Sequence, residues 1–273
     1  MEKRKPLAAL NIVFFIVACA VSNLSSFKIF RSRDIGSISD KFGTIFAPTG
    51  ITFSIWGVIY ISLLGFCIYH LRKAYSSDAN KESTTEILQI NWLFIINNLA
   101  VAAWVFAWLY EKLAISVILM LIQLITLLLI NIRLSIYDPS RSANSRIFTQ
   151  WPLSIYFAWI CIATIANIST WLVSIGWRGM GISDSYWTII MIGIASLITL
   201  FVVLVRRNVF FGLVVIWALY GIVLKRNEVN GQLYHDVILA CWGGIVFIAL
   251  AAIIQLYKNT RSGSSHVEPV AQI

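Results

Sequence analysis

Residues 151–175 read WPLSIYFAWICIATIANISTWLVSI, an apolar run without a single charged residue. A helix needs about 20 mostly apolar residues to cross the hydrocarbon core of a bilayer. This segment is long enough, so it predicts a membrane-spanning helix. Its few polar side chains need partners, because an unpaired amide in hydrocarbon is unfavourable. We therefore expect part of this helix to face protein or a ligand rather than lipid.

Apolar stretches of the same kind recur along the whole chain. The chain is 59% hydrophobic and 12% charged, whereas a soluble domain is about 45–50% apolar and about 25% charged. The charged residues lie between the apolar stretches. The sequence therefore predicts an all-α integral membrane protein, a polytopic bundle of about eight transmembrane helices. The expected spans are residues 7–26, 49–70, 87–110, 113–132, 151–175, 186–205, 208–224 and 236–257.

The lysine and arginine residues of the loops indicate an orientation. An even number of spans puts both chain ends on one side, and the loops of that side carry more of these residues than the loops opposite. Cytoplasmic loops are enriched in Lys and Arg, so we expect cytoplasmic N- and C-termini. The first span follows a short basic segment, and we expect it to be retained rather than cleaved as a signal peptide. The net charge of +9 does not indicate nucleic-acid binding, because the basic residues form no continuous face.

Two polar segments have distinct expected roles. The first loop, residues 27–47, carries many Ile and Phe residues among its charges, so we expect it to pack on the membrane surface or across the mouth of the bundle. The end of the chain, residues 258–273, is rich in Gly and Ser and is expected to be a disordered tail.

The sequence offers little for catalysis. The four cysteines lie singly within apolar spans, without the spacing of a metal or redox site. His70 and His235 fall at the ends of spans and His266 lies in the tail. No carboxylate lies in the interior of an expected span. Acid–base catalysis and proton-coupled transport both commonly use such groups. We therefore expect no enzyme activity, no metal and no resident cofactor.

The second span carries an aromatic pair on one face. Trp56 and Tyr60 are four residues apart, so their side chains are neighbours on a helix. Phe53 and Gly57 extend the same patch, and Pro48 precedes the helix, where its missing N–H is tolerated. This patch predicts either the lining of a pocket or ordinary packing between helices.

The fifth span carries a longer stripe. Trp159, Ala163, Asn167 and Trp171 follow one another at four-residue steps, and Tyr156 precedes Trp159 by three. A stripe that contains an amide is unsuited to lipid, so this face is expected to look inward.

The third span repeats the combination of amides and indoles. Asn97 and Asn98 lie on its first half, and Trp104 follows within the same apolar run. The two amides predict hydrogen bonds between helices or contacts to a bound molecule, and the sequence leaves both open.

Together these motifs resemble the translocator protein family, also called tryptophan-rich sensory proteins or TspO. The signature of the family's second helix is a proline, a tryptophan eight residues later and a tyrosine four residues after that, as in Pro48, Trp56 and Tyr60. The first loop resembles the lid of that family. The signature of its fifth helix is matched by Tyr156, Trp159, Ala163, Asn167 and Trp171.

The chain also departs from the family's pattern. Ile155 stands where the family has a proline before the tyrosine, and Gly50 stands where it has a second tryptophan. Asn98 and Trp104 are six residues apart, not three. The resemblance covers five helices, so we expect residues 1–175 to form a TspO-like region. Residues 176–257 would then add three further transmembrane helices.

The resemblance implies a protein that binds or senses a small, flat, apolar ligand of tetrapyrrole or sterol type. Facilitated transport of an apolar solute, or a channel for one, without proton coupling is the alternative. The expected partners are the lipid bilayer and a small apolar ligand such as a porphyrin or haem-like molecule, and a homodimer is left open. The implied ligand-binding residues are Trp56, Tyr60, Asn97, Asn98, Trp104, Tyr156, Trp159, Ala163, Asn167 and Trp171.

Overall fold

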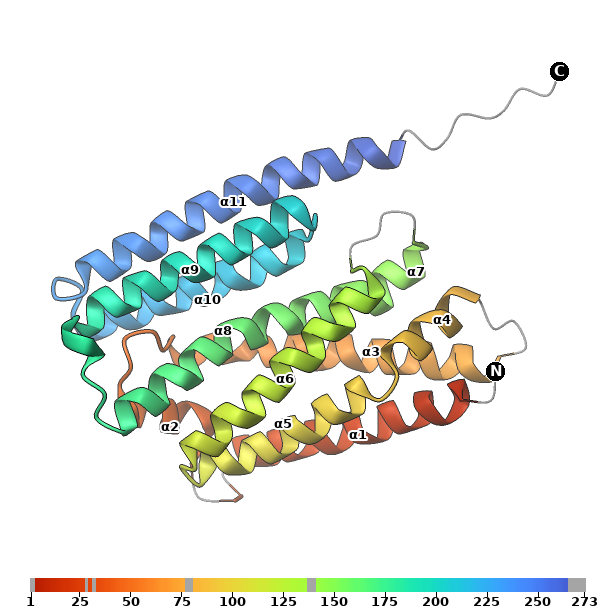
Figure 1. Ribbon diagram of the computed structural model, residues 1–273, viewed down its shortest axis with the longest axis horizontal. Helices are drawn as coiled ribbons and strands as arrows, with labels where there is room; N and C mark the ends of the chain where they lie inside the picture. The colour runs from red at the N-terminus through yellow and green to blue at the C-terminus, as the bar shows by residue number, and fades with distance from the viewer. Residues whose placement is uncertain (1–2, 28, 31–32, 77–80, 137–140, 265–273) are drawn as a thin grey trace.

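The computed structural model describes residues 3–27, 29–30, 33–76, 81–136 and 141–264, without the side chains of residues 26, 81 and 261–264. Within these ranges the regular structure is entirely helical, and long helices lie roughly side by side along the long axis (Figure 1). The expected all-α polytopic membrane bundle is confirmed.

The first part of the chain supplies five long helices and several short ones. The long helices are α1 (Arg4–Ser26), α3 (Ile55–Tyr75), α5 (Leu93–Leu109), α6 (Leu113–Leu134) and α8 (Trp151–Ser174). The short elements are α2 (Ile35–Phe42), the 3₁₀ helix η1 (Gly50–Ser54), α4 (Lys81–Ile90), α7 (Ala143–Ser145) and the π-helical turn η2 (Arg146–Gln150).

The second part adds three long helices after the short turn η3 (Gly179–Gly181). They are α9 (Asp184–Val205), α10 (Val209–Asn230) and α11 (His235–Ser264). Glycines let these helices approach closely: a Cβ on Gly244 would lie 2.7 Å from the Ser196 hydroxyl, and one on Gly212 would lie 2.9 Å from Val203. Small residues are common where transmembrane helices pack.

The third expected span is not one straight helix. Residues 87–110 were predicted as continuous, but α4 and α5 meet at a bend of 49°. Asn91 adopts a left-handed backbone with φ of 50°, which asparagine tolerates better than most residues. The described chain thus has seven helices able to span a membrane, or eight if the bent pair counts as one span.

Three helices continue five or more residues beyond their predicted ends. α3 extends to Tyr75 rather than residue 70, α10 extends to Asn230 rather than residue 224, and α11 continues through Ser264, past residue 257. Residues 265–273 of the predicted tail lie outside the described residues. The start of α1 and the end of α11 lie at the same end of the bundle (Figure 1), as an even number of crossings requires.

Helix α10 joins the added helices to the first part of the chain. The Trp217 indole N–H donates to the Thr52 carbonyl at 3.0 Å, and the Thr49 amide donates to the Gly221 carbonyl at 3.0 Å. A Cβ on Gly221 would stand 2.0 Å from the Thr52 hydroxyl. Only glycine therefore allows η1 to lie this close to α10.

Candidate functional site

A cavity of about 520 Å³ lies where α1, α2, η1, α3 and α5 meet. Its volume is within the range of roughly 300–1,000 Å³ that is typical of small-molecule sites. Three of the implied ligand-binding residues line it: Trp56, Tyr60 and Trp104. The other residues that line it are Ser22, Asn23, Asp34, Ile35, Gly36, Gly50, Phe53, Ser54, Gly57 and Val101.

The aromatic wall of the cavity is built on α3. Trp56 and Tyr60 stack with their ring centres 5.2 Å apart and their planes 27° apart. Behind them Trp159 meets Trp56 edge-on at 6.3 Å, and Tyr156 lies 6.1 Å from the same indole. The four-residue spacing on α3 therefore presents one stacked pair to the cavity, and α8 supports this pair from behind.

The aromatic residues in and behind this wall also take part in hydrogen bonds between helices. Trp104 donates its indole N–H to the Asn167 side chain at 2.9 Å, and the Asn167 amide donates to the Ser116 hydroxyl at 2.8 Å. The Tyr156 hydroxyl donates to the Asn97 side-chain oxygen at 2.6 Å. The Asn97 and Asn167 side chains thus form hydrogen bonds with residues of other helices. Such bonds are one of the two roles that the sequence predicts for buried amides.

Several residues expected on the cavity wall lie elsewhere. Asn98, Trp159 and Ala163 were predicted to line the same cavity as Trp56, but they are not among its lining residues. Asn98 donates to the Phe94 carbonyl of its own helix, Trp159 is buried behind Trp56, and Ala163 is partly buried in the main core. The reason is the rotation of α8, which turns its stripe toward neighbouring helices. Trp171 is partly buried in the same core.

Helix α2 covers one side of the cavity. It begins with a capping box, in which the Asp34 carboxylate accepts from the Ser37 amide at 2.7 Å while the Asp34 amide donates to the Ser37 hydroxyl. The Trp108 indole donates to the Ile35 carbonyl at 3.1 Å, which ties the helix to α5. The first loop therefore packs over the bundle mouth, one of its two expected positions.

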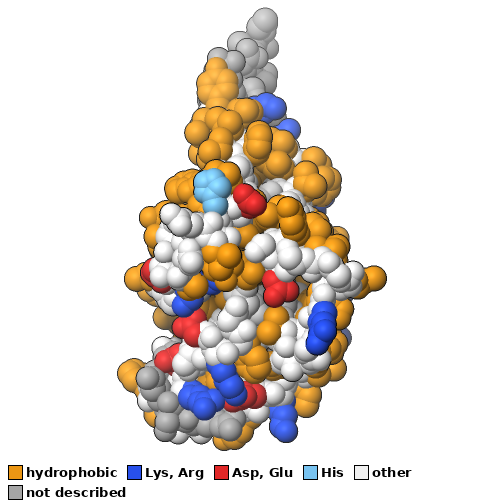
Figure 2. Space-filling model, turned by 90° about the vertical axis from the view of Figure 1, so that its left-hand side faces the viewer, with side chains coloured by type: hydrophobic (Ala, Val, Ile, Leu, Met, Phe, Trp, Pro, Cys, Tyr) orange, Lys and Arg blue, Asp and Glu red, His pale blue; other side chains and the backbone are white. Residues whose placement is uncertain are grey.

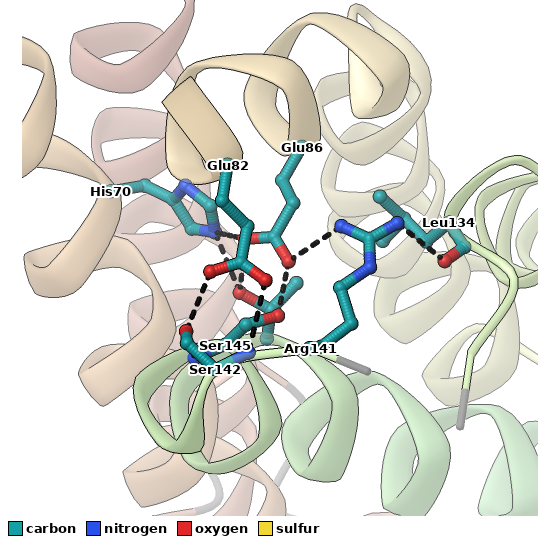
Figure 3. Close-up of polar contacts among 8 residues, drawn as sticks. His70, Glu82, Glu86, Leu134, Arg141, Ser142 and Ser145 are labelled. Atoms are coloured by element: carbon teal, nitrogen blue, oxygen red, sulfur yellow. Dashed lines mark hydrogen bonds and ion pairs between the residues drawn. The ribbon is translucent and has the colours of Figure 1, made fainter. Parts of the chain in front are cut away.

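A polar cluster that the sequence did not predict (Figure 3) lies around α4 and α7, at the end of the bundle opposite α2 (Figure 1). Glu86 on α4 is 1% exposed and accepts hydrogen bonds from Ser145 and from Thr149, the latter at 3.0 Å. Arg141 donates to it at 3.2 Å, and the His70 ring lies 3.8 Å away. A buried carboxylate needs this number of donors to be tolerated.

This cluster corrects two expectations. His70 was placed at a span end, but it is 2% exposed within α3 and bonds to Thr149 at 3.0 Å. No ionisable group was expected inside a span, yet Glu86, one residue before the expected third span, is buried in the bent α4–α5 pair. The spacing of Glu82 and Glu86, four residues apart on one helical face, was the available signal. Glu82 accepts from the Ser142 amide and hydroxyl, so both acids face the α7 turn.

The cavity offers stacked aromatic faces with a few polar groups at its edge. This composition is usual for a site that holds a small apolar molecule. Among the described residues no group of three or more His, Cys, Asp or Glu side chains could hold a metal ion.

The chain is similar to a known family of proteins. The model of a family described as TSPO-like protein matches residues 8–254. No curated protein matches the chain, and no solved structure matches it. The matched region includes α9, α10 and most of α11, so it continues past residue 175, where the motif resemblance ended.

Proposed function

Because this chain belongs to the TSPO-like protein family, we propose that it binds a flat, apolar ligand of tetrapyrrole or sterol type in the cavity beside Trp56 and Tyr60. Family membership supports a multi-pass membrane protein that binds or senses a small ligand. The ligand class and the cavity are our proposal, as is a role in binding rather than catalysis.

The observation that carries the proposal is the stacked Trp56–Tyr60 pair in the wall of a 520 Å³ cavity. Aromatic faces prefer an offset or edge-on partner ring at about 4.5–7 Å, and a flat polycyclic ligand would supply one. Trp104 adds a third indole to the same lining, and its N–H is already bonded to Asn167. The ring can therefore contact a ligand without a new unpaired donor being buried.

The edge of the cavity suits a ligand with a polar rim. Asp34, Ser22, Asn23 and Ser54 contribute the polar groups among its lining residues. An apolar site with a few placed polar groups is the usual composition of a small-molecule pocket. Porphyrins with acidic or ester side chains and sterols with one hydroxyl both have this distribution of polarity.

Gly57 provides the sharpest test of the cavity. It lines the space, and a Cβ built on it would meet no atom within 4 Å. Gly57→Leu should therefore fill the cavity without clashing, and it removes a glycine that disfavours the helix by about 1 kcal/mol. We expect saturable quenching of tryptophan fluorescence by protoporphyrin or by a quenching sterol analogue in the wild-type protein, and a loss of at least tenfold in affinity in the variant.

The matched control is Gly193→Leu. Gly193 is an exposed glycine of α9, and its Cβ would also meet no atom within 4 Å. Both variants should keep the wild-type melting temperature or exceed it. If Gly57→Leu stays folded and still binds porphyrin and sterol as wild type does, this cavity is not the ligand site.

A further inference from the structure

A second cavity, of about 430 Å³, lies at the end of the bundle where α8 passes into α9. It is lined by residues 42–46 at and after the end of α2, the last two turns of α8, Trp177 in the connection and the first two turns of α9. This end of the bundle faces the viewer in Figure 2, where acidic and basic side chains lie scattered among hydrophobic ones. The 520 Å³ cavity and this one have no lining residue in common.

The α8–α9 connection contains three glycines and brings two indole rings close to each other at this cavity. Gly176, Gly179 and Gly181 take positive φ angles between 66° and 86°, a conformation that glycine adopts without strain. The Trp187 indole donates to the Gly179 carbonyl at 2.7 Å, and a Cβ on Gly179 would come within 2.8 Å of that ring. Trp177 and Trp187 consequently lie with ring centres 5.3 Å apart.

Two acceptors in the lining have no partner in the described part of the chain. The Thr44 residue is 4% exposed, and its hydroxyl makes no hydrogen bond there. The Asp184 carboxylate, in the first turn of α9, forms neither an ion pair nor a side-chain hydrogen bond among the described residues. No lysine or arginine belongs to the described residues that line this cavity.

We propose that this cavity binds an amphipathic cation, an apolar molecule that carries a protonated amine. The amine would donate to Asp184 and Thr44 and lie against the Trp177–Trp187 pair, because indole faces attract ammonium groups. The apolar part would fill the space between Phe42, Phe46, Leu172 and Met191. The proposal is independent of the ligand of the 520 Å³ cavity.

The experiment compares two probes that differ in charge but hardly in shape, 4-phenylbutylamine and 4-phenylbutanol. Binding is measured at neutral pH, where the amine is protonated, by calorimetry on the full chain in nanodiscs of zwitterionic lipid. We expect the amine to bind about tenfold more tightly than the alcohol, which corresponds to about 1.4 kcal/mol. Asp184→Asn should reduce that preference to less than about threefold.

The control is Asp236→Asn. Asp236 is likewise an exposed aspartate in the first turn of a helix at the same end of the bundle. This variant should retain the tenfold preference, which excludes a general effect of surface charge. Gly57→Leu should retain amine binding as well, which separates this cavity from the other one.

The inference is overturned if the two probes bind equally well to the wild-type protein, or if Asp184→Asn keeps the preference. Should Asp184→Asn fail to fold, Thr44→Val provides the second variant, since it removes the unpaired hydroxyl at nearly constant volume. A preference unchanged in Thr44→Val would contradict the assigned role of that hydroxyl.

Discussion

Glu86 is the side chain whose removal should most affect stability. Glu86→Ala would leave Arg141, Ser145 and Thr149 without their shared acceptor inside the bundle. Breaking a buried ion pair by removing one partner costs about 3–5 kcal/mol, so we expect a marked fall in melting temperature in detergent. The readout is thermal unfolding followed by size-exclusion chromatography.

Glu228→Ala serves as the control for this prediction. Glu228 is an exposed acid near the end of α10, and surface substitutions usually change stability by no more than about 0.5 kcal/mol. Equal melting temperatures for the two variants would show that the Glu86 cluster does not stabilise the bundle.

Individual residues differ in how far the sequence could assign them. Trp56 and Tyr60 could be assigned to one face of a helix because residues four apart are neighbours on its surface. Ala163 was misplaced because the rotation of α8 about its axis depends on the helices around it. Glu86, His70 and Arg141 were missed because they come from three distant segments, and no spacing along the chain shows that they meet.

The contact between η1 and α10 links the added helices to the 520 Å³ cavity. Gly50, Phe53 and Ser54 belong to or end η1 and also line that cavity. Because η1 is held by Trp217 and by the Gly221 carbonyl, α10 determines where these three residues stand. The added helices therefore influence the shape of the proposed site, although none of their residues lines the cavity.

This link leads to a prediction for Gly221→Val. The new side chain would collide with Thr52, whose hydroxyl would stand 2.0 Å from the Cβ, so η1 must move away from α10. Overpacking costs about 1–3 kcal/mol, and we expect lower thermal stability together with at least a threefold loss of porphyrin or sterol affinity, measured by fluorescence quenching.

The comparison variant is Gly243→Val on α11, where a Cβ would meet no atom within 4 Å. It should leave both the melting temperature and the affinity close to wild type. A Gly221→Val protein that is destabilised but binds normally would show that η1 is not held in place by α10.

Most helices could be predicted from hydropathy, but their interruptions could not. Apolar runs give the positions of α6 and α9 nearly to the residue, because hydrocarbon requires a continuous helix there. The bend at Asn91 coincides with a single left-handed backbone conformation. In the extension of α10 to Asn230, Arg226 is 3% exposed and lies 5.0 Å from the Tyr234 ring. A charged residue ended the predicted span, although tertiary contacts allow the helix to continue.

The topology of the whole molecule can be tested directly. We predict that the segment 71–86 and the segment after Arg261 both face the cytoplasm, from the bias of Lys and Arg along the chain. Reporter fusions at both places should give the same cytoplasmic signal. Signals on opposite sides would mean that the bent α4–α5 pair does not cross the membrane as one span.

The family match extends beyond the region that the motifs indicate. The prediction of a five-helix region with three added helices came from motifs that end at Trp171, whereas the matching family model continues to residue 254. The motifs consist of tryptophans and their partners at fixed spacings along a helix. Helices α9–α11 carry no such motif that we could recognise in the sequence. The hydrogen bonds from α10 to η1 agree with a single architecture across this region.

The bend at Asn91 also affects the fit between the protein and its bilayer. Helix α5 has 17 residues, and at 1.5 Å per residue it is about 25 Å long, shorter than a hydrocarbon core of about 30 Å. Helix α11, with 30 residues, is by the same measure about 45 Å long. We therefore expect the lipid around this protein to meet helices of unequal length on different flanks. A membrane can adapt by thinning beside α5, while α11 tilts or protrudes into the headgroups.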